Sequence, residues 1–197
     1  MVYCISDVPS SEKSQGAEGL LAEDHEALDK LLSALLAALD KRDAPTAFAR
    51  LDLFWARLAM HIRAEHLLLF PAILRALHGD TGERADETPP TAQAREAIAQ
   101  LRRDHDFFMH ELAGAIKVMR DRRTTAGGDS TSEIESVRQV IARLRTRLEA
   151  HNELEEDMVY RLPAKLLEPE EQTALEVQIR DELKNLPPRF PDEAGDD

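Results

Sequence analysis

The chain has 197 residues, of which 43% are hydrophobic and 32% are charged, and its formal net charge is -13. This length suits one domain with a sizeable core, and the negative charge argues against nucleic acid or an anionic membrane as a partner. Cys4 is the single cysteine, which excludes an internal disulfide and a thiolate metal cluster. The N-terminus has no signal-peptide pattern and no apolar run approaches membrane-spanning length, so we expect a cytoplasmic protein.

Four segments carry apolar residues in alternating steps of three and four, which is the period of a helix with one buried face. After a tail over residues 1–16, we predict helices over about 17–40 and 45–77, with Pro71 as the point where a kink would fall. Residues 80–90 form a predicted loop, and the third helix starts near Thr91 as its N-cap. The fourth helix follows a loop at 124–130 and is closed by Pro163.

The connections between these helices are short, so neighbouring helices should run antiparallel. The sequence therefore predicts an all-α fold: an up-down-up-down four-helix bundle over residues 17–162. Residues 163–197 would add a short amphipathic C-terminal helix, over about 168–186, and an acidic tail.

Each predicted helix of the bundle has a histidine where its buried stripe should carry an apolar residue. These histidines are His25, His61, His105 and His151. Each lies about 18 to 24 residues from the middle of its nearest turn, so antiparallel packing brings all four to roughly one height. Glu65 and Glu155 lie one helical turn beyond His61 and His151, on the same faces.

A single histidine on an apolar face is most often a core residue with one hydrogen bond. Four at one height, with two buried glutamates, favour a metal site, because a buried carboxylate is costly without a partner and a metal-free polar network is hard to complete. Imidazole and carboxylate without thiolate suit iron, manganese or zinc. Two carboxylates that can each bridge suit two cations, and a helix bundle with such ligands is a di-iron or di-manganese environment. The Glu-x-x-His pairs of ferritin-like proteins and the His-Glu-x-x-His zinc motif are absent from the sequence.

The candidate residues fall into short motifs: Asp24-His25-Glu26, His61-x-x-x-Glu65 leading into Leu69-Phe70-Pro71, Asp104-His105 and His151-x-x-x-Glu155. Together these motifs resemble the hemerythrin-like (HHE cation-binding) family over about residues 17–162. The resemblance implies a non-haem di-iron centre, in which two iron ions share an oxo or hydroxo bridge and carboxylate bridges. It implies His25, His61, His105 and His151 as terminal ligands and Glu65 and Glu155 as bridging ligands.

The chain departs from the oxygen-carrying hemerythrins on two helices. The carriers have His-x-x-x-His on the third helix, whereas here Met109 is four residues after His105 and His110 is rotated away. The carriers have His-x-x-x-x-Asp on the last helix, where this chain has Glu155 four residues after its histidine. The motifs are more similar to bacterial hemerythrin-like proteins linked to nitrosative stress and iron-centre repair, and to eukaryotic iron-sensing hemerythrin domains.

By this resemblance we expect a non-haem di-iron protein that reacts with or senses nitric oxide, oxygen or peroxide. Its role would lie in a stress response or in iron-centre repair, and a redox partner protein would exchange electrons with it. The alternatives are a non-catalytic iron or oxygen sensor and an oxygen-binding or storage protein, so whether the chain is a di-iron oxidoreductase stays open. We interpret Trp55, Phe107 and Met109 as core residues, and His66 as a surface residue or one that supports a ligand.

Overall fold

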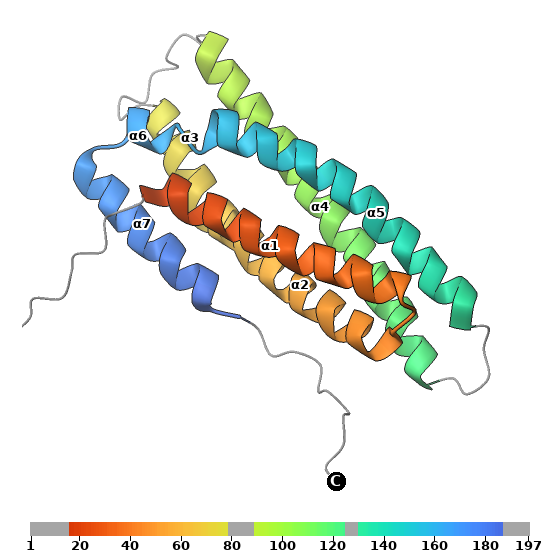
Figure 1. Ribbon diagram of the computed structural model, residues 1–197. Coiled ribbons are helices and arrows are strands. Elements are labelled where there is room, and N and C mark those ends of the chain that lie inside the picture. Colours follow the sequence, from red (N-terminus) through yellow and green to blue (C-terminus); the bar gives the residue numbers. More distant parts are fainter. Residues whose placement is uncertain (1–15, 79–88, 125–129, 187–197) are drawn as a thin grey trace, which may run out of the picture.

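The computed structural model describes residues 16–78, 89–124 and 130–186, and the regular elements in these ranges are all helical. The bundle consists of α1 (Gly16–Asp40), α2 (Ala44–Ala64), α4 (Pro89–Thr124) and α5 (Ser130–Leu154). Figure 1 shows these four helices side by side; α1 packs on α2 and α5, and α4 packs on the same two helices. The prediction of an all-α bundle is confirmed. Within the described ranges, none of the helices has both the length and the apolar character that crossing a membrane requires.

Two of the bundle helices widen into π-helical segments. After α2 the chain continues as η1 (Glu65–Leu69) and then α3 (Phe70–His78). After α5 it continues as η2 (Glu155–Val159), and α6 (Pro163–Leu166) follows a short turn. Each π-helical segment therefore begins at one of the two glutamates singled out in the sequence. Single π-helical turns are rare and are frequently found at functional sites.

The π-helical turns change which residues face the core. Counting at the α-helical period predicts Leu68 and Met158 on the buried stripe, but Met158 is 36% exposed and Leu68 is only partly buried. Leu69 and Val159 are fully buried instead. The sequence prediction is wrong at these positions because each π-helical turn takes in one residue more than an α-helical turn. Pro71, the predicted position of a kink, is the second residue of α3 and follows η1 after Phe70. Its ring has no N–H to continue an α-helical ladder.

The start of α4 also differs from the prediction. Thr91 was expected as the N-cap after a double proline in the loop, but the helix begins at Pro89. Prolines fit the first turn of a helix because the backbone N–H groups there have no intrahelical partner.

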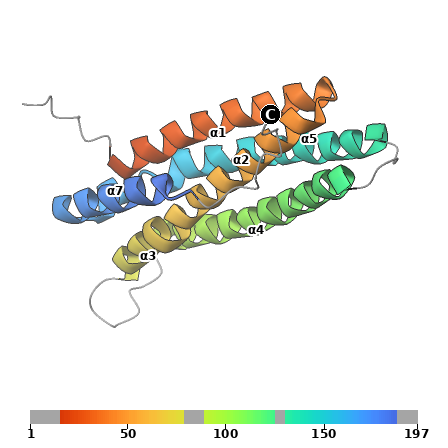
Figure 2. The ribbon, with the colours of Figure 1, turned by 90° about the horizontal axis from the view of Figure 1, so that it is seen from below.

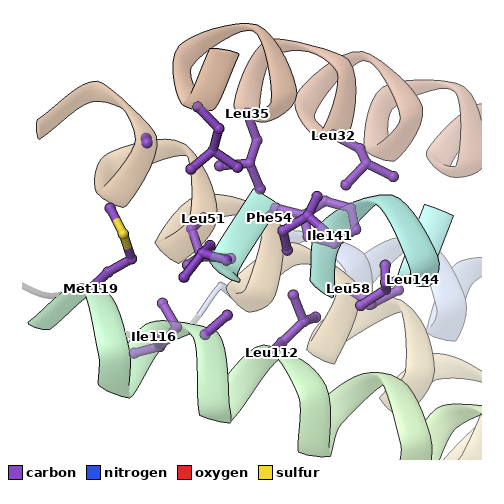
Figure 3. Close-up of a cluster of buried hydrophobic side chains, with 14 of the residues drawn as sticks. Leu32, Leu35, Leu51, Phe54, Leu58, Leu112, Ile116, Met119, Ile141 and Leu144 are labelled. Atoms are coloured by element: carbon purple, nitrogen blue, oxygen red, sulfur yellow. The ribbon is translucent and has the colours of Figure 1, made fainter. Parts of the chain in front are cut away.

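The apolar core forms two clusters, one on each side of the layer that contains the histidines. The larger cluster lies toward the turn between α1 and α2 and receives side chains from all four bundle helices (Figure 3). Its members include Leu32, Leu35, Leu51, Phe54, Leu58, Leu112, Ile116, Met119, Ile141 and Leu144. The smaller cluster joins residues of α1, the end of α2, η1, α3, α4, η2 and α7 (Pro169–Lys184).

The last helix, α7, covers the smaller cluster. It packs against α1, α2 and η1, and Figure 2 shows it alongside these helices. Leu175 and Ile179 are its buried apolar side chains, and Glu182 forms an ion pair with Arg63 of α2 at 2.8 Å. The predicted extra C-terminal helix is thus present, and its buried face explains its amphipathic sequence.

Candidate metal centre

The six residues predicted from the sequence come together in one buried layer. Each is at most 6% exposed, and the set is His25, His61, Glu65, His105, His151 and Glu155. On α1, Leu21 lies one turn to one side of the layer and Leu28 lies one turn to the other, each in a different apolar cluster. The polar layer is therefore enclosed between two apolar clusters, where electrostatic interactions are strong and an unpaired charge is costly.

The four histidines form two pairs. The Nε2 atoms of His25 and His61, the first pair, are 3.1 Å apart. The Nε2 atoms of His105 and His151, the second pair, are 3.0 Å apart. Two imidazole nitrogens that each lie about 2.1 Å from one ion, at a right angle, would be about 3 Å apart. Each pair therefore has the spacing of two ligands to one cation.

The two glutamates connect the pairs. Glu65 Oε1 lies 3.7 Å from Nε2 of His61, and Glu65 Oε2 lies 3.2 Å from Nε2 of His105. Glu155 Oε2 lies 3.2 Å from Nε2 of His25 in the first pair. Glu155 Oε1 lies 2.9 Å from Nε2 of His151 in the second pair. Each carboxylate thus presents one oxygen to each pair, which is the arrangement of a carboxylate that bridges two cations.

One oxygen of each glutamate has an imidazole nitrogen as its nearest polar neighbour and no well-aligned hydrogen-bond donor in the described residues. These oxygens are Glu65 Oε2, 3.2 Å from Nε2 of His105, and Glu155 Oε1, 2.9 Å from Nε2 of His151. A buried carboxylate oxygen without a donor destabilises the fold. Cations between the pairs would satisfy both oxygens, and a donor set of imidazole nitrogen and carboxylate oxygen fits iron, manganese or zinc.

An aspartate orients one histidine of each pair from behind. His61 Nδ1 donates to Asp24 Oδ2 at 3.0 Å, while Arg57 donates to Asp24 Oδ1 at 2.8 and 2.6 Å. Although burial favours the neutral acid, the hydrogen bonds and charges of His61 and Arg57 lower the pKa of Asp24 below its ordinary value. The aspartate therefore fixes a proton on Nδ1 and leaves the lone pair of Nε2 directed at the centre.

The second pair repeats this arrangement. Asp104 accepts from Arg147 at 2.8 and 2.6 Å, and His151 Nδ1 lies 3.4 Å from its other oxygen. Arg-x-x-x-His-x-x-x-Glu thus occurs twice with the same spacing, at 57–65 and at 147–155, each paired with an Asp-His dipeptide of the preceding helix. The histidines and glutamates were predicted from the sequence, but this repeat of α1–α2–η1 in α4–α5–η2 was not, although the recurring arginine is visible in the sequence.

Tyr160 is a central residue that the sequence analysis missed. Its hydroxyl donates to Glu65 Oε1 at 2.7 Å and lies 3.1 Å from Glu155 Oε2, 3.1 Å from His25 Nε2 and 3.2 Å from His61 Nε2. Burial and the two carboxylates raise its pKa well above the ordinary value. Tyr160 is five residues after Glu155, which is off the face in an α-helix but is one turn in a π-helix.

Without a metal, protons hold this centre together. Burial lowers the pKa of His25, but hydrogen bonds and charge from Glu155 and Glu156 outweigh it and raise the pKa to about 9. The same balance, with Glu155 and Glu65 as the anions, raises the pKa of His105 to about 9. At neutral pH these two rings are imidazolium ions, whose positive charge a cation would replace.

Five other residues singled out in the sequence pack against the core, face solvent or contact a candidate ligand. Trp55, Phe107 and Met109 pack against the larger apolar cluster, which confirms them as packing residues. His110 is exposed, as its rotation from His105 predicts. His66 supports a candidate ligand, because its Nε2 lies 2.8 Å from Nδ1 of His105. Cys4 and the two predicted tails lie outside the described residues.

A family model, the hemerythrin HHE cation binding domain, matches residues 18–162. A search of curated proteins and a search of solved structures found no match. The matched range contains all six candidate residues, and the two groups that could hold a metal ion are His25–His61–Glu155 and His105–His151–Glu155. The family binds metal cations, usually iron, and the buried histidines and glutamates fit that chemistry. The chain belongs to the hemerythrin HHE cation-binding family.

Proposed function

We propose that this is a non-haem di-iron protein that reacts with or senses a small ligand, namely nitric oxide, oxygen or peroxide. The proposed ligands are His25, His61, Glu65, His105, His151 and Glu155. The observation that carries the proposal is that each glutamate presents one oxygen to each histidine pair. Two bridging carboxylates between two nitrogen pairs hold two cations better than one.

When bound, iron would supply one-electron chemistry and a coordination position for a small ligand. The chain supplies the rest. Asp24 and Asp104 keep the imidazoles oriented, and the two apolar clusters exclude charged solutes and bulk water. The hydroxyl oxygen of Tyr160 lies 2.7 Å from Glu65 Oε1 and donates its proton there, inside the centre, where a reacting oxygen species would need one. This proton supports a reaction rather than simple storage.

A sensor of iron or oxygen is the second candidate, and the contact between η1 and α7 favours it. Glu65 is the first residue of η1, and η1 packs against α7. Loss of metal from Glu65 would therefore loosen the surface on which the C-terminal helix rests. Under either proposal we place the protein in the cytoplasm, in a stress response or iron-centre repair, with a redox partner for the reacting form.

The decisive experiment is metal analysis of protein purified without oxygen, followed by addition of nitric oxide, oxygen or peroxide. We expect close to two iron ions per chain, antiferromagnetic coupling in the oxidised form, and turnover of one of these ligands. Glu155→Gln is the matched variant, because it keeps the shape but removes the bridging charge, and it should lose iron. One stable zinc ion without iron uptake would contradict the proposal. Full iron loading without turnover, together with metal-dependent hydrogen exchange in α7, would select the sensor.

A further inference from the structure

The two halves of the centre have the same candidate ligands but differ at two matched positions beside them. The residue that directly follows the glutamate is His66 in the first half and Glu156 in the second. The residue five positions after the glutamate is Phe70 in the first half and Tyr160 in the second. These four side chains cross over, so that each pair of histidines is supported by residues of the opposite half.

The first histidine pair receives the charged and polar side chains. His25 Nδ1 donates to Glu156 Oε1 at 2.7 Å. The ring of Tyr160 stacks on His25 with centroids 5.5 Å apart, and its hydroxyl lies 3.1 and 3.2 Å from the Nε2 atoms of His25 and His61. Asp24 contacts Nδ1 of His61, so both imidazoles of this pair have a carboxylate behind them, at Nδ1. The hydroxyl oxygen of Tyr160 already lies in front of both rings, beside their Nε2 atoms.

At the matched positions the second pair contacts two uncharged side chains, His66 and Phe70. His105 Nδ1 lies 2.8 Å from Nε2 of His66, so an imidazole stands where the first pair has a carboxylate. The ring of Phe70 stacks on His105 with centroids 6.2 Å apart and an interplanar angle of 12°, and it has no hydroxyl. Among the described residues, Asp104 is the carboxylate that lies behind this pair, at Nδ1 of His151.

This difference affects the two metal positions in a defined direction. A carboxylate behind an imidazole increases the electron donation of the ring to a metal and stabilises the higher oxidation state. A nearby hydroxyl oxygen adds to this, because oxygen donors prefer the harder, more oxidised ion. An imidazole and a phenyl ring contribute neither effect. Phe70 adds no hydroxyl oxygen to the carboxylate oxygens of Glu65 and Glu155 that face the second pair.

We infer that the centre is divided in function: the first pair holds the ion that stays oxidised, and the second pair holds the ion that is reduced first and takes the external ligand. This inference rests on the proposed di-iron function. His66 and Glu156 act through the histidines they contact, and are therefore positioning residues. Tyr160 adds to the same division from the front of the first pair.

Mössbauer spectroscopy of the holoprotein loaded with ⁵⁷Fe tests the inference. We expect two distinct iron signals in the oxidised form, and reduction in two separate steps with the valence localised after the first. Azide, added as the external ligand to the oxidised form, should shift one signal only. His66→Glu should change that same signal, whereas Glu156→His should change the other. Glu153→His is the control, since it makes the same chemical change at an exposed position of α5 and should change neither.

A protein that binds two iron ions with identical signals and a single reduction step would overturn the inference and leave the di-iron function standing. Azide acting on the signal that responds to Glu156→His would also overturn it. Failure of the wild-type protein to bind iron would refute the proposed function instead. If either variant fails to load iron, Tyr160→Phe and Phe70→Tyr provide a second test. The first should bring the two reduction steps closer together, and the second should move the azide-sensitive signal.

Discussion

Removal of the metal should make the stability of this protein fall as pH rises above neutral. Burial alone would lower the pKa of His25 and His105, but the surrounding carboxylates raise both to about 9 from the ordinary 6.5. Because the folded state holds these protons more tightly than the unfolded state, the stabilisation is complete below pH 6.5. It is lost as pH rises through about 9.

The size of the effect follows from the two pKa values. A rise from 6.5 to about 9 corresponds to about 3 kcal/mol for one histidine. Both rings face the carboxylate of Glu155, so their contributions do not add fully, and we expect roughly 3–5 kcal/mol in total. For a chain of this size that lowers the melting temperature by about 10 °C.

Thermal melting of the metal-free protein, followed by circular dichroism from pH 6 to 10, measures this effect. The metal-loaded protein is the first control and should vary much less, because cations replace the protons. His25→Gln is the second control and should remove roughly half of the pH dependence. Metal added to the metal-free protein near pH 7 should release about two protons. Stability that stays constant or increases between pH 6.5 and 9 would refute the reasoning.

Three further outcomes are expected. Glu65→Ala removes one of the two proposed bridging carboxylates, so iron content should fall from about two per chain to one or fewer, as measured by metal analysis; unchanged loading would show that this carboxylate does not bridge. Asp24→Asn leaves Arg57 without its anion and His61 with a weaker acceptor, so competition with a chelator should show metal affinity lowered about 10–100-fold. Phe54→Ala opens a cavity in the larger cluster and should lower the free energy of unfolding in urea by about 3–5 kcal/mol with iron content unchanged, whereas Leu67→Ala, at a position 59% exposed, should have little effect.

The sequence predicted the bundle and brought six polar residues to one layer because the α-helical period holds along most of the chain. Histidines on the buried stripes of four helices can be read directly from spacing. The same period failed where the helices widen: it misassigned Leu68 and Met158, and it hid Tyr160, which only a π-helical turn brings to the centre. The contact of Asp24 with His61 could not be predicted from residue spacing either. The aspartate contacts a histidine of the neighbouring helix and not His25, its neighbour in sequence.

The division of the candidate ligands between two helical hairpins matters for how the chain folds. Each hairpin can bring its own pair of histidines together, because the members of a pair are 36 and 46 residues apart in sequence. The glutamates reach across, so the full set of donors forms only after the hairpins have docked. A chain with one cysteine has no internal disulfide to join distant segments. Metal coordination would perform that task here, as a reversible cross-link that closes two local loops and fastens the hairpins to each other.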